Sequence, residues 1–585
     1  MNKNDKVTLK KFFSIQCKVL KEIFKYYKFE TISILILNAI VVFSEIINLK
    51  FLEYLTDNIA FYYKEMQNIK KIFFIVLLFF LMLITLHLIE SIYNFLKAKY
   101  INKITFEVEK KFINKLADIS YEFYENNSFY EKIYLANDVS NQYYKGVFGI
   151  TELLRIIILL ITYGIFLSKI NILFIFIITI SIIVSIIVSI KVTDKQLDFW
   201  RKYVSPVTRK NNYFKGIVTS RINQKNIQNT RSIEYFIVKY NYYNNKERFN
   251  YLKLNFLSFL SEIGSTIFFV ISFLMITIII GKGVVNLKFN IGFFSMSIAM
   301  LMNLFIVVKQ FSLFMMNNNW HIRTLEAYYD IINTKDFNAY YKMSNKSNLI
   351  DLIDISYKYN NTDNYALKNI NLKFNEGEKI SIVGVNGSGK TTLISIILEL
   401  FKNYEGVYIK NEIYYSSILQ DYNNYQLSIK ENIEIGCGGE VLTENEIYDL
   451  LRKVDLYDFI INMPNGIYTK LGQLENGVEF SVGQWQRLAI CRLLANKKAN
   501  VWILDEPTAY QDPISEIELY KLVFSLSNNK LVFFISHRLG FSKFADKIMV
   551  VDNGKVVEYD THNNLMRKPN GLYAKMFNIQ KSWYK

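Results

Sequence analysis

Long uncharged apolar runs separated by polar and basic segments dominate the first 320 residues of the chain. The four clearest runs are Ile72–Ile89, Ile170–Ile190, Ile263–Gly281 and Phe289–Val308. Each is close to the roughly 20 residues that a helix needs to cross a bilayer. Two further spans are predicted from Thr31 to about Leu52 and near 147–168. The pattern therefore predicts a transmembrane domain of six helices over residues 31–320.

Charged residues interrupt the predicted span near 147–168, where Glu152 and Arg155 occur. These two residues lie three positions apart on one helical face, so they could pair with each other. A lone charge in the middle of a bilayer costs about 3 kcal/mol. A position at the membrane interface is therefore the simpler interpretation.

Two long segments between the apolar runs, 92–145 and 191–262, hold most of the Lys and Arg residues of this half. By the positive-inside rule these segments lie in the cytoplasm, and an even number of spans puts both termini there too. Each segment is long enough for two helical arms of about 25 residues. Turn signals at Asn126–Ser128 and Asn229–Thr230 indicate where the arms reverse. The stretches SFYEKIY and SIEYF that follow are candidate helices for contact with a cytoplasmic domain, with ordinary loop helices as the alternative.

The N-terminal segment 1–30 contains a shorter apolar pattern, in which Ile15, Val19, Ile23 and Phe24 recur at helical spacing with lysines between them. This pattern predicts an amphipathic helix that lies along the cytoplasmic membrane surface. A soluble amphipathic helix is the alternative.

The pattern changes at about residue 348, after a polar linker predicted over 321–347. From there, short β-branched runs such as ISIVGV, VWILDE, LVFFISH and KIMVV alternate with helical stretches. This alternation predicts an α/β domain with a largely parallel sheet over residues 348–585. The predicted fold is a polytopic all-α transmembrane domain followed by a separate α/β domain.

Composition and charge agree with a membrane class. Of the 585 residues 51% are hydrophobic, and Pro206 is the only proline before residue 348. The net charge is +17, yet basic residues outnumber acidic ones 43 to 24 before residue 348 and number 26 against 28 from there on. The basic excess thus belongs to the membrane half, which favours cytoplasmic loops over a nucleic-acid partner. The chain has three cysteines, too few and too scattered for a disulfide framework or a zinc site.

A glycine-rich loop follows the predicted strand Ile380–Val383 and precedes an apolar helix. The loop reads Gly384, Val385, Asn386, Gly387, Ser388, Gly389, Lys390, Thr391 and Thr392. Strand, glycine loop and helix are the context of a phosphate-binding loop, as in the P-loop NTPases. The glycines let backbone N–H groups face the phosphates, and the helix N-terminus adds partial positive charge. We expect Lys390 to reach the β- and γ-phosphates of ATP and the Thr391 hydroxyl to bind Mg²⁺.

A second predicted strand over 501–505 ends in two adjacent acids, Asp505 and Glu506. A parallel sheet would bring them beside the glycine loop. Asp505 suits the Mg²⁺ shell, and Glu506 suits a base or orienting group for the attacking water.

The remaining motifs occur in the order found in ATP-binding-cassette (ABC) ATPases, and the whole chain resembles an ABC exporter half-transporter of the cell membrane. The resemblance implies a cytoplasmic nucleotide-binding domain with Glu506, His537 and Gln420 as catalytic residues. It also implies that Tyr359 stacks on adenine, that Gln420 joins Thr391 and Asp505 around Mg²⁺, and that Asp512 belongs to the D-loop. Ser481, Val482, Gly483 and Gln484 match the signature that caps the ATP of the opposite subunit.

Such a site requires a dimer, because the glycine loop leaves the γ-phosphate open and a second surface must supply hydroxyl and N–H donors. The partner is a second copy of the chain or a related half-transporter. Val482 stands where the family has glycine, and a β-branched residue disfavours φ > 0, so the shape of the signature is open. The D-loop is also unusual, with Ala-Tyr-Gln-Asp in place of Ser-Ala-Leu-Asp. Glu506 and His537 are intact, which predicts hydrolysis and transport by alternating access.

The cargo is the least specified feature. The stretch GQWQRLAICR, with Trp485, resembles exporters of bacteriocin- and lantibiotic-type peptides, which makes a peptide the first hypothesis. A peptidase domain does not fit in the roughly 30 residues before the first span. Polar residues of the spans such as His87, Glu90 and Asn303 could line a cavity or bond neighbouring helices. A multidrug or lipid exporter for amphipathic cargo is the alternative, and a non-transporting ATP-gated sensor, channel or resistance module is the second.

Overall fold

The computed structural model describes ten continuous stretches of the chain and scattered positions between 176 and 196. The stretches are 9–65, 69–168, 198–337, 341–343, 348–359, 362–420, 422–472, 477–506, 513–536 and 538–583. The chain divides into two compact units. The first comprises Met1–Asp118 and Ser128–Thr334, and the second comprises Ile119–Asn127 and Lys335–Lys585.

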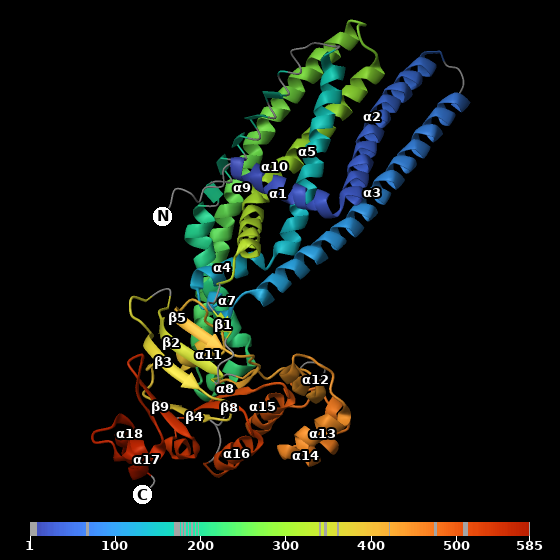
Figure 1. The fold of residues 1–585 in the computed structure, drawn as a ribbon. Coiled ribbons are helices and arrows are strands. Elements are labelled where there is room, and N and C mark those ends of the chain that lie inside the picture. The colour runs from blue at the N-terminus through green and yellow to red at the C-terminus, as the bar shows by residue number, and fades with distance from the viewer. Residues whose placement is uncertain are drawn as a thin grey trace. The chain divides into compact units, whose positions relative to one another are not determined.

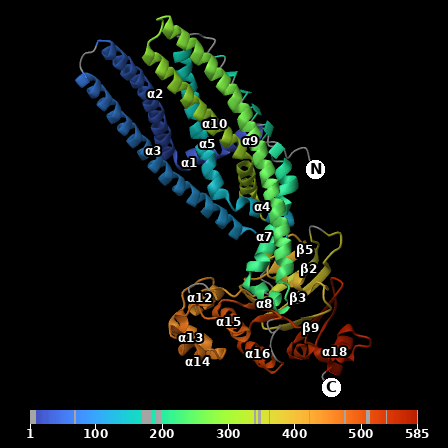
Figure 2. The same cartoon turned by 180° about the vertical axis from the view of Figure 1, so that it is seen from behind.

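The first unit is built of long helices (Figures 1 and 2). They are α1 (Leu9–Tyr26), α2 (Lys28–Glu65), α3 (Ile69–Asp118), α4 (Asn127–Ala136), α5 (Val139–Ser168), α7 (Ser205–Thr219), α8 (Arg221–Asn229), α9 (Ile233–Val285) and α10 (Ile291–Asn333). The helices reverse near the predicted turns, since α4 begins at Asn127 and α8 ends at Asn229. The SIEYF stretch opens the 53-residue helix α9 and is not a separate short helix.

Among the described residues, three helices are long and apolar enough to cross a membrane: Lys28–Tyr62, Lys70–Asp118 and Ile233–Val285. Shorter apolar helices cover Leu154–Phe166 and Ile291–Ile306. The predicted span Ile170–Ile190 lies largely outside the described residues, so the count of six remains a prediction. Large apolar side chains line the outer face of α3, where Phe73 is 69% exposed and Phe80 is 59% exposed. A bilayer would be a suitable solvent for such a face.

The apolar core of the first unit lies where α2, α5, α9 and α10 pack together. Its buried members are Val42, Leu49, Ile156, Leu159, Tyr163, Phe269, Ile276, Ile280, Met296, Met300, Leu301 and Leu304. An ion pair crosses this core, in which Arg155 Nη2 of α5 lies 2.5 Å from Glu45 Oε1 of α2. Helical spacing allowed Arg155 to pair with Glu152, whose side chain lies outside the described part of the structure. The partner that the structure gives Arg155 is Glu45, 110 positions away.

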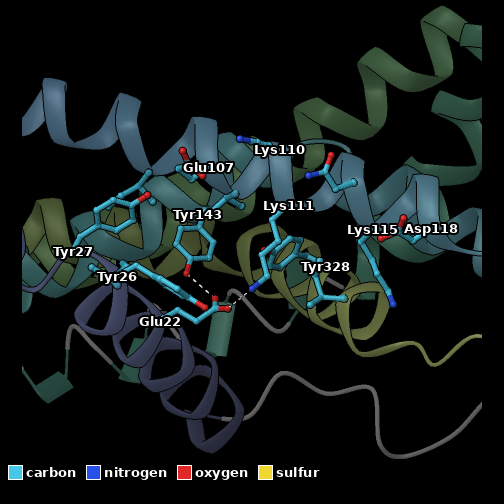
Figure 3. Close-up of a pocket in the computed structure, with 15 residues that line it drawn as sticks. Glu22, Tyr26, Tyr27, Glu107, Lys110, Lys111, Lys115, Asp118, Tyr143 and Tyr328 are labelled. Atoms are coloured by element: carbon cyan, nitrogen blue, oxygen red, sulfur yellow. Dashed lines mark hydrogen bonds and ion pairs between the residues drawn. The ribbon is translucent and has the colours of Figure 1, made fainter. Parts of the chain in front are cut away.

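Helix α1 is held against the bundle by its polar residues as well as by buried Ile15, Val19 and Ile23. The Glu22 carboxylate accepts a hydrogen bond from Tyr143 at 2.9 Å and pairs with Lys111 at 2.7 Å (Figure 3). It also accepts a hydrogen bond from Tyr329 at 2.9 Å. These partners come from α5, α10 and α3. Phe24, which the pattern placed on the same apolar face, is 37% exposed.

A cavity of about 480 Å³ lies beside Glu22 (Figure 3). Its charged lining residues are Glu22, Glu107, Asp118, Lys110, Lys111 and Lys115. Acids and lysines are equal in number, so the lining has no net charge that would select an anion or a cation.

The second unit contains two sheets, whereas the alternating pattern predicted one largely parallel sheet. The smaller has the order β1 (Tyr341–Met343), β5 (Glu405–Lys410), β2 (Ile350–Tyr357) and β3 (Leu367–Phe374). The larger has the order β10 (Lys555–Asp560), β9 (Lys547–Asp552), β4 (Lys379–Val383), β8 (Leu531–Ile535), β7 (Val501–Asp505) and β6 (Tyr415–Ile418). All neighbours from β9 to β6 pair in parallel, and β10 alone runs antiparallel. The central strands are continuous apolar runs because both faces of a parallel sheet are covered.

Helices complete the second unit. They are α11 (Lys390–Ile397), α12 (Ile429–Glu434), α13 (Glu444–Lys453), α14 (Tyr457–Ile461), α15 (Val482–Ala495), α16 (Pro513–Leu526), α17 (His562–Arg567) and α18 (Leu572–Trp583). The predicted linker 321–347 is helical up to Asn333, as the end of α10.

Candidate functional site

Four adjacent parallel strands of the larger sheet end at one edge, and each is followed by a predicted site segment. The glycine loop follows β4, Gln420 follows β6, Asp505 and Glu506 end β7, and His537 comes after β8. In the register of the strands, Ile535 lies opposite both Ile382 and Asp505. Ligands of α/β proteins bind outside the carboxyl ends of such strands. His537 itself lies outside the described residues.

The backbone of the glycine loop requires glycine at two positions. Gly384 has φ +154°, and a Cβ there would lie 2.1 Å from the carbonyl oxygen of Val551. Gly389 has φ +107°, and a Cβ there would lie 2.8 Å from the carbonyl oxygen of Ala366. Both contacts are with backbone carbonyl oxygens, which cannot rotate away as the end of a side chain can. A side chain at either position would therefore displace the loop.

The polar groups of the loop fit a phosphate. Ser388 is 3% exposed, and its buried Oγ has no hydrogen-bond partner among the residues that the structure describes. Lys390 Nζ donates to the carbonyl oxygens of Gly384 at 2.9 Å and Val385 at 3.0 Å, which holds the amine over the loop. Burial lowers the pKa of Lys390, and the charges of Glu506 and Asp505 act in the opposite direction. A buried hydroxyl, an ammonium group and the N-terminus of α11 together form an anion-binding environment.

The two acids at the end of β7 differ in their surroundings. Asp505 is 3% exposed, and burial and the neighbouring Glu506 charge raise its pKa to about 6, against the effect of Lys390. A buried acid of this kind suits a bound cation, with the exposed Thr391 and Gln420 as further oxygen donors. Glu506 has φ +49°, and its N–H donates to the Ile535 carbonyl oxygen at 3.1 Å. Non-glycine residues in this left-handed region cost about 1–2 kcal/mol and concentrate at functional sites.

Tyr359 follows β2 and is half-buried. Its hydroxyl lies 3.0 Å from Thr392 Oγ1 of the glycine loop, and its ring packs edge-on against Phe401 at 5.8 Å between centroids. Phe401 and Tyr357 pack around Tyr359, and sequence reasoning missed both. The aromatic alternation in ISYKYN is the one signal for Tyr357, and Phe401 has none.

The signature residues begin α15, whose neighbours are α12 and α13. Ser481 is the N-cap: its Oγ accepts from the N–H of Gln484, whose side chain accepts from the N–H of Ser481. Val482 is the first helical residue and therefore has helical backbone angles, so valine needs no left-handed conformation here. The N–H of Gly483 lies in the first turn, where helical N–H groups lack intrahelical acceptors.

The predictions for Asp512 and Trp485 remain to be compared with the structure. Asp512 of the predicted D-loop lies outside the described residues. Trp485 is 4% exposed and packs against Phe480 at 5.7 Å between ring centroids. Its side chain therefore belongs to the core of the second unit and is not available to contact cargo.

The match to a known protein family lies in the second unit. Residues 367–509 match the family described as ABC transporter. The nisin transport ATP-binding protein NisT of Lactococcus lactis subsp. lactis is 37% identical over 232 residues, which cover 37% of this chain and 38% of the relative. The subtilin transport ATP-binding protein SpaT of Bacillus subtilis is 36% identical over 237 residues, or 38% of each chain. A putative multidrug export ATP-binding/permease protein of Staphylococcus aureus (strain NCTC 8325 / PS 47) is 34% identical over 249 residues, 40% of this chain and 42% of that protein.

These alignments span about two fifths of the length of each curated relative. The fold is matched over a much longer stretch. The solved structure of a bacterial Atm1-family ABC exporter with ATP bound has a TM-score of 0.77 at 18% identity. The match covers 96% of this chain and 99% of that chain, so the fold of the whole chain is that of an ABC exporter.

Proposed function

We propose that this chain, which carries an ABC transporter domain on the fold of an ABC exporter, is a half-transporter that uses ATP hydrolysis to export a substrate across the cell membrane. The observation that carries the proposal is the common edge of β4, β6, β7 and β8, which gathers the glycine loop, Gln420, Asp505 and Glu506. Such an edge suits a triphosphate with its metal ion.

The roles of the residues follow from their chemistry. Val385, Asn386, Gly387 and their neighbours in the loop present N–H groups to the phosphates, and Lys390 binds the terminal phosphates. Asp505, Thr391 and Gln420 supply oxygen ligands for Mg²⁺, which when bound would neutralise charge on the phosphates. Glu506 orients the attacking water. Its left-handed backbone conformation, which is strained for a non-glycine residue, supports a role in catalysis. We place Tyr359 against adenine and His537 at the γ-phosphate by resemblance.

A dimer completes the site in this proposal. The Ser481 hydroxyl accepts from the Gln484 N–H and keeps its own hydrogen for donation to an ATP held by the partner. The N–H of Gly483 adds a second donor. The helical backbone of Val482 supports a signature loop of ordinary shape, which could cap the ATP of a partner subunit. The proposed partner is a second copy of the chain or a related half-transporter.

The proposed substrate is a peptide of the bacteriocin or lantibiotic type, because NisT and SpaT carry nisin and subtilin transport in their names. A multidrug exporter is the second candidate, since the S. aureus relative is named for multidrug export. Both readings place the chain in the membrane, with the second unit and the termini in the cytoplasm. We propose that the chain is divided into a membrane-spanning domain at 31–320, a linker at 321–347 and a nucleotide-binding domain from 348 onward.

The decisive experiment compares purified wild-type protein with a Glu506→Gln variant in proteoliposomes containing Mg²⁺ and ATP. We expect phosphate release by the wild type and a loss of about 10²-fold or more in the variant, because the water loses its orienting carboxylate. Equal phosphate release by both proteins would contradict the assignment. Stimulation by lantibiotic-type peptides but not by drugs or lipids would support peptide export, and stimulation by none would favour the ATP-gated sensor.

A further inference from the structure

The turn between α3 and α4, residues Ile119–Asn127, belongs to the second unit although the helices on either side belong to the first. It contains a short 3-10 helix, Tyr121–Phe123. Nine residues of the predicted cytoplasmic arm are thus part of the compact body that holds the candidate nucleotide site.

Glu122 is the most deeply buried charged residue of this turn, with 2% exposure. One carboxylate oxygen, Oε2, accepts hydrogen bonds from the backbone N–H groups of Lys402 and Asn403, each at 3.1 Å. The other, Oε1, accepts from the Tyr357 hydroxyl at 3.3 Å. A buried carboxylate needs such donors, and the donors in turn are costly to leave unpaired. Glu122 therefore links the loop after Phe401 to the end of β2.

The same two elements are joined by stacked rings. Tyr357 and Phe401 stack at 5.0 Å with an interplanar angle of 7°, and Tyr121 stacks on the Phe401 ring at 6.3 Å. Burial and the Glu122 carboxylate raise the pKa of Tyr357, so its hydroxyl stays protonated and donates. Offset-stacked aromatic pairs have restricted geometry, which fixes the rings in register with the carboxylate.

Tyr359 rests on this group of residues. Its ring contacts Tyr357 edge-on at 5.2 Å and Phe401 edge-on at 5.8 Å. On its far side, the Tyr359 hydroxyl lies 3.0 Å from Thr392 Oγ1. A continuous set of contacts therefore runs from Glu122 through two aromatic rings to the residue predicted to stack on adenine and on to the glycine loop.

A second anchor holds the turn beside Glu122. Asp336 accepts from the Ser120 hydroxyl at 2.5 Å and from Lys402 Nζ at 2.9 Å. Burial opposes ionisation of Asp336, but the hydrogen bonds from Ser120 and Lys402 outweigh it and lower its pKa. Lys402 is thus held by its backbone through Glu122 and by its side chain through Asp336.

We propose that Glu122 is a positioning residue for nucleotide binding, which sets the orientation of the Tyr359 ring through Tyr357 and Phe401. The proposal rests on the proposed ATP-binding function. Glu122 does not touch the nucleotide; it fixes the two elements on which Tyr359 packs. Loss of the carboxylate weakens the contact with the base and leaves the glycine loop able to bind phosphates.

The test uses the full-length protein and three variants. Glu122→Ala removes the acceptor for three donors, Glu122→Gln keeps an amide oxygen for the two N–H groups, and Glu125→Ala removes an exposed acid from the same turn as a control. Affinity for radiolabelled ATP is measured in a Glu506→Gln background, and KM and kcat are measured without it. Inhibition by inorganic tripolyphosphate reports on the phosphate loop alone.

Stacking between a base and an aromatic ring contributes about 5- to 150-fold in affinity, so we expect Glu122→Ala, which misplaces the ring without removing it, to weaken ATP binding and raise KM by about tenfold. We expect kcat to stay within about twofold of wild type, with tripolyphosphate inhibition unchanged. Glu122→Gln should restore most of the affinity, and Glu125→Ala should match the wild type.

Equal ATP affinity in Glu122→Ala and wild type would overturn the inference and leave the proposed function standing. An equal loss of ATP and tripolyphosphate binding would also overturn it, because that points to a general structural role. No ATP binding by the wild type would instead refute the proposed function. If Glu122→Ala does not fold, Tyr357→Phe decides: it keeps the ring and removes one donor, and an unchanged KM there refutes the proposal.

Discussion

The ion pair between Glu45 and Arg155 provides a quantitative test of the packing of the first unit. Arg155 Nη2 and Glu45 Oε1 are 2.5 Å apart, and the two side chains are 26% and 23% exposed. Val42 and Leu49 of α2 and Ile156 of α5, which lie near the pair in the sequence, belong to the buried apolar core of this unit. Arg155 Nε is buried without a hydrogen-bond partner among the described residues. The ion pair with Glu45 through Nη2 therefore compensates the guanidinium charge.

We expect Arg155→Met and Glu45→Leu each to lower the free energy of unfolding by about 2–3 kcal/mol. A fully buried pair loses about 3–5 kcal/mol when one partner is removed, and an exposed pair loses less than about 1 kcal/mol. The partial exposure of this pair places it between these limits. The double variant removes both charges, so it should lie within about 1 kcal/mol of wild type, which gives a coupling energy of about 3–6 kcal/mol.

Thermal unfolding in detergent, followed by size-exclusion chromatography with fluorescence detection, measures the four proteins of this cycle. Glu152→Gln is the matched control, because Glu152 is the partner that helical spacing alone suggests. A fall in stability for Glu152→Gln together with a neutral Glu45→Leu would refute the recorded pairing. Strictly additive effects of the two single variants would refute the coupling.

Three further substitutions test the second unit. Gly389→Ala should abolish ATP binding in an equilibrium assay, because its Cβ would lie 2.8 Å from the Ala366 carbonyl oxygen at φ +107°. Trp485→Ala should cost about 3–5 kcal/mol by leaving a cavity. Cargo preference of the surviving protein should not change, and an altered preference would contradict the core assignment. Hydrogen bonds from the Ser428 side chain and backbone, together with Lys470, hold the pKa of Glu431 at about 2, below its ordinary 4.5. The stability from this shift is full above about pH 5 and lost as pH falls towards 2, so Glu431→Gln should flatten the acid side of a pH–unfolding curve.

Sequence patterns were sufficient for the α/β unit because its determinants are local. Buried β-branched runs predicted β4, β7 and β8, and parallel pairing then brings Gly384 and Asp505 to one edge without further information. The need for glycine at position 389 could also be predicted, since the phosphate-binding loop motif has glycine there. The helical backbone of Val482 was missed, although Ser481 and Gln484 stand three positions apart as in a capping box, a sequence signal for the start of a helix.

Contacts between residues far apart in the chain could not be predicted from the sequence, for a physical reason. Helical spacing reveals only local pairs, so it offered Glu152 as a possible partner of Arg155 and could not indicate Glu45, which lies 110 positions away. Glu122 is a stronger case, because its partners at 280 and 281 positions' distance are backbone N–H groups. Every residue except proline has such a group, and no side-chain pattern can identify the ones that bind Glu122.

The placement of residues 119–127 leads to a prediction about where the nucleotide-binding unit ends. A fragment of residues 335–585 lacks the turn, so the Lys402 and Asn403 N–H groups meet water, the Tyr357 hydroxyl loses its Glu122 acceptor and the Phe401 ring loses the cover of Tyr121. Tyr357 and Phe401 are 2% and 4% exposed in the full chain, and uncovering some 50 Å² of apolar surface costs about 1–2 kcal/mol. We expect the fragment to unfold several degrees below the corresponding transition of the intact protein. A synthetic peptide of residues 118–128 should restore part of the difference, and the same peptide with Glu122→Ala should restore less. Equal effects of the two peptides would show that the aromatic contacts alone hold the turn in place.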